Sequence, residues 1–157
     1  MPVVSAVMVP HPPLIVPEVG RGEERRVSST IAAYGTAVKF LKDSQPDTLV
    51  ITTPHSLFYV DRFHISPGES AKGSFAAFRA PGVKISVDYD TAFTLALRDA
   101  AVKAGLQVDT SAERDPSLDH GTMVPLYFVE KAYRFGKLPK IVRIGLSGLP
   151  LSDHYRL

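Results

Sequence analysis

A short apolar run that stops at a proline and is followed by a histidine is the feature that most constrains this chain. Residues 49–51, Leu-Val-Ile, are apolar and partly β-branched, and they lie between Pro46 and Pro54. This pattern predicts a buried strand. Because proline cannot donate a hydrogen bond to a neighbouring strand, we expect the strand to end before Pro54. His55 then follows the carboxyl end of the strand, where open α/β sheets bind ligands. A solvent-exposed loop histidine is the alternative.

The same order of features occurs near the N-terminus. Residues 3–9 form an apolar run that leads into Pro10-His11-Pro12-Pro13, so we expect a second strand there. If the two strands are parallel neighbours, His11 and His55 meet at one edge of the sheet and provide half of a metal site. The flanking prolines restrict the backbone and lower the entropy lost on binding. Two unrelated turns are the alternative interpretation.

Periodicity along the rest of the chain predicts an α/β domain. Apolar residues from about 23 to 42 recur at helical spacing, which predicts a helix between the first two strands and hence a βαβ unit. Further strands are expected at 59–66, 83–87 and 140–146, and further helices at about 89–104 and 122–133. Strands that are nearly all apolar need cover on both faces. We therefore predict the α/β class, with a single domain in which a mixed, mostly parallel β-sheet is flanked by helices on both faces.

Other segments carry weaker patterns. In the expected strand at 59–66, apolar and polar residues alternate, which predicts that His64 lies on the solvent face. Residues 71–82 are rich in alanine and glycine and contain two phenylalanines, a composition that suits either the wall of a cavity or the cap of a core. Residues 111–117 and 147–157 are polar, so we expect exposed loops there.

A third histidine motif precedes the last expected helix. Residues 118–122 read Leu-Asp-His-Gly-Thr and run into an apolar segment. Asp119 can orient the imidazole of His120 or act as a carboxylate behind a metal ligand. Alternatively, Asp119 simply caps the helix, and the two roles are compatible. The amides at the helix start would favour a bound oxygen or anion nearby.

Composition excludes several classes of protein. The chain has no cysteine, so disulfides and cysteine-ligated zinc or iron–sulfur sites are excluded, and a metal must be bound by His, Asp, Glu or water. The net charge is +2 without a long basic run, so we expect no nucleic-acid partner. No apolar run approaches the roughly 20 residues that span a bilayer, and the N-terminus lacks a signal-peptide pattern. We therefore expect no membrane partner and a cytoplasmic location.

The three histidine motifs together resemble a known family. They resemble the class III extradiol ring-cleavage dioxygenases of the LigB type, and within them the subgroup named protein B of the AmmeMemoRadiSam system, relatives of Memo. The match runs over nearly the whole chain in the order of the family. The residues that carry it are Val9-Pro10-His11-Pro12-Pro13, Thr53-Pro54-His55, and Leu118-Asp119-His120-Gly121-Thr122 with Val124-Pro125-Leu126.

The resemblance implies a non-haem iron enzyme of aromatic catabolism. His11 and His55 match the two histidines that bind Fe(II), and zinc is the alternative metal. His120, with Asp119 beside it, matches an active-site histidine near the substrate. The implied substrates are a small aromatic diol, whose ring is opened, and O₂. The family completes its metal site with a glutamate.

The resemblance also implies that the LigB-like domain at 1–157 is incomplete at its C-terminus. We expect the third metal ligand beyond Leu157, because none of Glu18, Glu69 and Glu113 matches it. An incomplete domain leaves an apolar face uncovered beside His11, so we expect a homo-oligomer or self-association through that face.

Two other functions stay open. One is a non-catalytic, Memo-like binding partner of a radical SAM system, since a fold does not fix a reaction. The other is a hydrolase in which His11, His55 and His120 bind zinc and activate water.

Overall fold

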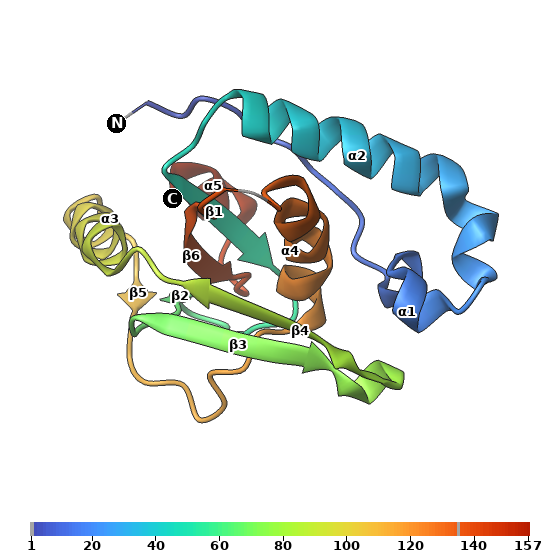
Figure 1. Cartoon of the computed structure of the whole chain (residues 1–157). Coiled ribbons are helices and arrows are strands. Elements are labelled where there is room, and N and C mark those ends of the chain that lie inside the picture. Colours follow the sequence, from blue (N-terminus) through green and yellow to red (C-terminus); the bar gives the residue numbers. More distant parts are fainter. Residues whose placement is uncertain (1, 135) are drawn as a thin grey trace.

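A four-stranded sheet lies at the centre of the fold, and the computed structural model describes residues 2–134 and 136–157 (Figure 1). The strands are β1 (Thr48–Thr53), β2 (Phe63–Ile65), β3 (Ser70–Phe75), β4 (Ala80–Asp88), β5 (Val108–Asp109) and β6 (Lys140–Gly145). The α-helices are α1 (Pro17–Gly20), α2 (Ser28–Asp43), α3 (Thr91–Lys103), α4 (His120–Ala132) and α5 (Leu151–Arg156). Short 3₁₀ helices occur at η1 (Pro13–Ile15), η2 (Glu23–Val27) and η3 (Ala76–Phe78).

The central sheet has the strand order β1–β6–β2–β5. β1 and β6 are parallel, from Thr48 opposite Lys140 to Thr53 opposite Gly145. β5 is parallel to β2, whereas β2 is antiparallel to β6. β3 and β4 form a separate antiparallel hairpin. The sheet is therefore mixed and mostly parallel, and the α/β class predicted from the sequence is confirmed.

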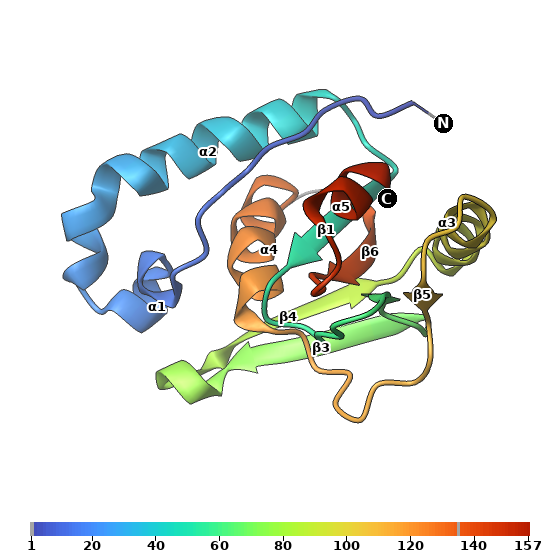
Figure 2. The ribbon, with the colours of Figure 1, turned by 180° about the vertical axis from the view of Figure 1, so that it is seen from behind.

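Helices cover both faces of the sheet (Figures 1 and 2). Successive residues of a strand point to opposite faces, and β6 shows which helices each face meets. Ile141 joins the large core formed with α2 and α4. Val142 and Ile144 join a second cluster with Phe93 of α3 and with Leu157, which follows α5. Within the described residues, no helix has the combination of length and apolar character needed to cross a bilayer.

Helix α4 is the most deeply packed helix and sets the position of the site. Its buried residues are Gly121, Thr122, Met123, Val124, Leu126, Tyr127 and Val129. Each fully buried Val, Leu or Met side chain contributes about 1.5–3 kcal/mol relative to exposure. Because these residues contact the sheet, α2 and the β3–β4 hairpin, the first turn of α4 is held rigidly against the end of β1.

The predicted strand at 3–9 is wrong, and with it the predicted βαβ unit. This segment is irregular and runs beside α2 in both views (Figures 1 and 2). It lies against β1 across a cavity of about 580 Å³. A strand gains stability from paired backbone groups and from burial. Neither is available here, since Val3 is 89% and Met8 100% exposed.

Two other predictions from local pattern are also wrong. His64 is buried rather than on the solvent side, because β2 lies between β6 and β5 inside the sheet. The segment 147–157 contains α5 in place of an all-loop tail. Predicted helix starts are shifted as well: α2 begins at Ser28 after η2, and α4 begins at His120.

Candidate metal centre

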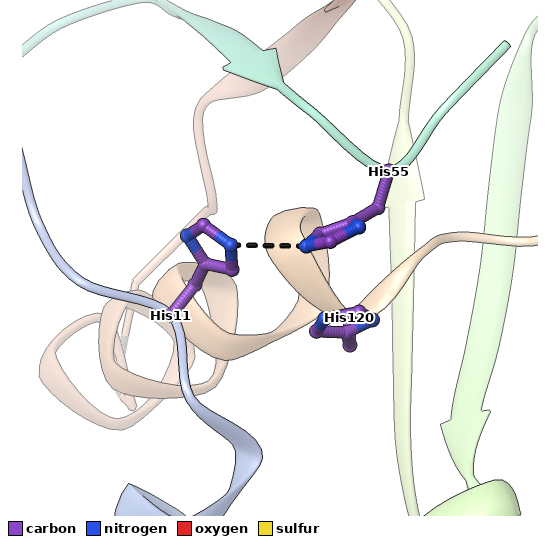
Figure 3. A group of neighbouring side chains, drawn as sticks. All are labelled: His11, His55 and His120. Carbon is purple, nitrogen blue, oxygen red and sulfur yellow. Dashed lines mark hydrogen bonds between the residues drawn. The ribbon is translucent and has the colours of Figure 1, made fainter. Parts of the chain in front are cut away.

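Three imidazoles meet where β1 ends and α4 begins (Figure 3). Ligand atoms of His11, His55 and His120 all lie within 4.8 Å of one another. The Nε2 atoms of His11 and His55 are 3.1 Å apart. The ring centroids of His55 and His120 are 4.0 Å apart, with a tilt of 32°. The structure thus brings the three predicted histidines together, and their chemical roles stay predictions.

His55 is placed by the end of β1. The strand stops at Thr53, which is fully buried, and Pro54 follows it. The Thr53 hydroxyl oxygen accepts a hydrogen bond from the His55 backbone N–H at 3.2 Å. This local turn directs the exposed His55 back toward α4 and defines where its imidazole can reach.

His11 is held without a strand. Before it, the Tyr34 hydroxyl on α2 donates a hydrogen bond to the Pro10 carbonyl oxygen. Burial raises the pKa of Tyr34 well above its usual range, so the phenol stays protonated and acts as a donor. After it, Ile15 and Val16 are fully buried and anchor η1. His11 therefore lies on a short segment whose two ends are both held in place.

Asp119 links the chain segments that carry His55 and His120. Its side chain caps α4 by accepting from the Thr122 backbone N–H at 3.0 Å and from the Thr122 hydroxyl at 2.8 Å. The same carboxylate accepts from the Thr53 hydroxyl at 2.7 Å. Its described hydrogen bonds therefore link the strand end that carries His55 to the helix start that carries His120.

Close approach at Gly121 makes this arrangement possible. A Cβ atom at that position would lie 2.6 Å from the Thr53 hydroxyl oxygen and 3.1 Å from Cδ2 of His55. Both distances are shorter than ordinary van der Waals contacts. The His-Gly sequence at the start of α4 therefore lets the helix backbone approach the end of β1 where a larger residue would push it away.

The environment lowers the pKa of His120. Burial of the imidazole is the main cause, and the neighbouring His55 and His11 add to it, while the charge of Asp119 acts in the opposite direction. A lowered pKa favours the neutral imidazole at neutral pH, whose free nitrogen lone pair can bind a metal or accept a proton.

The nitrogens of His11 and His55 are spaced to share one metal ion. Two nitrogens that share one ion at about 2.1 Å each, with an angle of about 90–110° between them, are roughly 3.0–3.4 Å apart. The 3.1 Å between the Nε2 atoms of His11 and His55 falls in this range. Imidazole suits iron, zinc, copper and nickel. Among the residues that the structure describes, the cluster of mutually close ligand atoms holds these three histidines and no carboxylate.

The three glutamates considered as the third ligand lie outside the histidine cluster. Glu113 pairs with Arg143 at 2.6 Å. Glu18 accepts a hydrogen bond from the Tyr127 hydroxyl at 2.6 Å. Glu69 is exposed just before β3. None of the three is part of the histidine cluster.

An apolar wall adjoins the cluster. The Phe78 ring, at the tip of the β3–β4 hairpin, meets the His120 ring edge-on at 5.4 Å between centroids. An open depression of about 660 Å³ adjoins the same histidines, and its lining is Met8, Val9, Pro10, His11, Pro12, Pro13 and His120. Of the two roles expected for residues 71–82, the structure supports the core, since Ala71, Phe75 and Ala80 are buried in it and Phe78 packs against it. The lining of the depression contains no residue of this segment.

Thr53 and Arg143 support the site and were not found from the sequence. Arg143 had a signal, since a charged residue inside the apolar strand 140–146 must find a buried partner. Thr53 stands directly before Pro54-His55, yet nothing in a local pattern shows that its hydroxyl binds a carboxylate 66 residues away.

Comparison with known proteins places the chain in a family. Residues 5–157 match the family described as the catalytic LigB subunit of aromatic ring-opening dioxygenase. Protein CA_C1420 of Clostridium acetobutylicum is 34% identical over 151 residues, which cover 92% of this chain and 32% of that protein. The chain thus spans about a third of the length of this curated relative. The chain belongs to the family of catalytic LigB subunits of aromatic ring-opening dioxygenases.

Proposed function

We propose that this chain carries the histidine part of an extradiol dioxygenase active site that binds Fe(II). The observation that supports this most is the 3.1 Å separation of the His11 and His55 Nε2 atoms, with His120 in the same cluster. His11 and His55 act as metal ligands, and His120 lies beside the substrate. The proposed substrates are a small aromatic diol and O₂.

The protein residues bind, orient and move protons. Iron held by His11 and His55 would supply open positions for the diol and O₂ and a path for electrons from the diol to O₂. His120 accepts a proton from a diol hydroxyl at its free ring nitrogen, which its lowered pKa makes available. Phe78 and the prolines around His11 offer an apolar surface against an aromatic ring.

A second candidate is supported by the third imidazole. Because ligand atoms of all three histidines lie within 4.8 Å of one another, they can bind Zn²⁺ and leave one position for water. In this alternative His120 is a ligand, and the protein is a hydrolase. A non-catalytic, Memo-like partner of a radical SAM system is the outcome if the chain binds neither metal.

Anaerobic titration with Fe(II) and Zn(II), followed by calorimetry, tests these functions. The variants are His11→Ala, His55→Ala and His120→Ala, and the matched control is His154→Ala on α5, outside the cluster. Iron binding that depends on His11 and His55 but not on His154 supports the dioxygenase site. Ring opening is then followed by absorbance with catechol as the probe. Zinc binding that all three cluster variants abolish equally favours the hydrolase.

A further inference from the structure

We propose that buried Arg143 is a positioning residue for the histidine cluster and acts on it through Asp119. One test of this inference measures metal affinity and so rests on the proposed function. A second test uses the metal-free protein, so the inference and the proposed function can fail independently of each other. Arg143 lies on β6, contacts none of the three cluster histidines in the described interactions, and would therefore act at one remove.

Each nitrogen of the Arg143 guanidinium donates a hydrogen bond inside the protein. Its side chain is 2% exposed. Its Nε donates to the Ser66 hydroxyl at 2.7 Å, its Nη1 to the Ser117 carbonyl oxygen at 2.9 Å, and its Nη2 to Glu113 Oε2 at 2.6 Å. A planar guanidinium can serve three such partners at once, whereas a lysine ammonium cannot match this fork.

Glu113 is held just as firmly on the other side of this pair. Its side chain is 2% exposed, and its Oε1 accepts from the Ser66 hydroxyl at 2.6 Å. The Nδ1 atom of buried His64 lies 3.5 Å from the same oxygen. Glu113 thus holds the guanidinium of Arg143 in place. It also connects the segment that precedes α4 to strands β2 and β6.

A second carboxylate faces the guanidinium. Oδ2 of Asp119 lies 3.6 Å from Arg143 Nη1. Arg143 therefore lies between a carboxylate that is locked in place, Glu113, and one that belongs to the site, Asp119. Attraction to the guanidinium favours a single position for the Asp119 carboxylate. This attraction is stronger in the protein interior than in water, because the local dielectric constant is low.

The position of Asp119 reaches both histidines by short paths. Through the Thr53 hydroxyl the Asp119 carboxylate is linked to the backbone N–H of His55. By capping α4 through Thr122 it also fixes the first turn of the helix, which begins with His120. A buried ion pair is weak evidence for stability, because apolar residues of similar volume often replace it without loss. A role in placing Asp119 explains why a charge stands inside this apolar strand.

Arg143→Met tests the inference, because methionine fills part of the space without charge or donors. The matched control is Val142→Ala, the adjacent buried residue, whose side chain packs on the opposite face of the sheet with Ile65 and Ile144. Both variants are compared with wild type in urea unfolding and in Zn(II) affinity. Arg143→Lys, which keeps the charge, serves if Arg143→Met does not fold.

We expect Arg143→Met to weaken Zn(II) binding by about 10- to 100-fold, the usual effect of losing a residue that orients a metal ligand. Val142→Ala, which removes buried apolar contacts from the same strand, should leave the affinity within about twofold. Equal losses of affinity in the two variants would overturn the inference, because they would show that general destabilisation is the cause.

A double-variant cycle tests the route through Asp119. If Arg143 acts through Asp119, the pair Arg143→Met with Asp119→Asn binds Zn(II) no more weakly than the weaker single variant. Losses that multiply would mean that the two residues act independently, and the inference would be wrong.

Ring nitrogen resonances of the metal-free protein separate this inference from the proposed function. We expect Arg143→Met to shift the ¹⁵N signals of His55 and His120 and to leave those of His154 unchanged, while Val142→Ala shifts none of them. If wild-type protein binds no metal, the proposed function fails and these shifts alone decide. Unchanged His55 and His120 signals would overturn the positioning role.

Discussion

The Thr53 hydroxyl lies 2.7 Å from Oδ1 of Asp119, and this hydrogen bond joins the end of β1 to the start of α4. The two residues are 66 positions apart in the chain. Because His55 and His120 follow them by only two residues and one residue, the bond sets the relative position of two of the three clustered imidazoles.

Removing the Thr53 hydroxyl should loosen the cluster. Thr53→Val keeps the shape of the side chain but removes the buried hydroxyl that donates to Asp119 and accepts from the His55 backbone N–H. Loss of these hydrogen bonds should cost about 1–3 kcal/mol in the free energy of unfolding. Urea unfolding measures it. Thr53→Ser keeps the hydroxyl and should lose less, and Thr52→Val on the exposed side of β1 should have little effect. Equal stability of Thr53→Val and Thr52→Val would contradict the role of this bond.

Two glycine-to-alanine substitutions should change the stability of the protein in opposite directions. Gly121→Ala forces a Cβ to within 2.6 Å of the Thr53 hydroxyl oxygen and should destabilise by about 1–3 kcal/mol. Gly35→Ala is the matched control within a helix, because a Cβ there meets nothing within 4 Å. It should stabilise α2 by about 0.5–1 kcal/mol. Thermal unfolding of both variants measures the difference, and a stabilising Gly121→Ala would refute the close approach.

The cap of α3 should make stability depend on acidic pH. The Asp90 carboxylate accepts from the Thr48 hydroxyl at 2.6 Å and from the Phe93 backbone N–H at 3.1 Å. The Thr48 hydrogen bond is the main reason that the pKa of Asp90 lies below its ordinary value of 3.8. The unfolded chain therefore binds this proton more tightly than the folded chain does.

It follows that the Asp90 contribution is fully present above the unfolded pKa and is lost as pH falls through the folded pKa. Asp90→Asn keeps an acceptor for the cap but cannot ionise. We expect wild type to exceed this variant in stability at pH 6 and the gap to shrink below about pH 4. Asp99→Asn, on the exposed face of the same helix, is the control that should show a smaller gap.

His120 should matter more for turnover than for metal content. If it acts beside the substrate, His120→Ala retains most of the bound Fe(II) and lowers catechol turnover by about 10²–10⁴-fold, the range for loss of an acid–base group. His55→Ala should lose the iron itself. Metal analysis of the purified variants and absorbance assays measure the two effects. An equal loss of iron in both variants would show that His120 is a ligand.

We propose that a second copy of the chain covers the open edge of β1, so the chain should self-associate. β1 is an edge strand, and Val50 on it is 49% exposed beside the apolar segment 3–9. Val50→Lys should weaken association, because charges on edge strands disfavour pairing. Val102→Lys on α3 is the control, since Val102 is similarly exposed but lies elsewhere. A monomer at every concentration in sedimentation would contradict this proposal.

The sequence by itself determined the elements that depend on local chemistry. β1 ends before Pro54 because proline cannot continue the ladder. The helix predicted at about 89–104 forms as α3 at Thr91–Lys103, where the Asp90 side chain caps the first amides. The Pro-His and Asp-His motifs named the histidines of the cluster. Two of these histidines stand at element ends, since His55 follows β1 and His120 begins α4, whereas the strand expected before His11 does not form.

Only the tertiary structure decided which neighbours each segment meets. The run at 3–9 has the composition of a strand, but strand formation needs a partner edge and burial, and here it has neither. His64 and Glu113 read as surface residues because alternation and polarity are local signals. Their burial around Arg143 follows from the placement of β2 between β5 and β6, an outcome of long-range pairing that no local pattern contains.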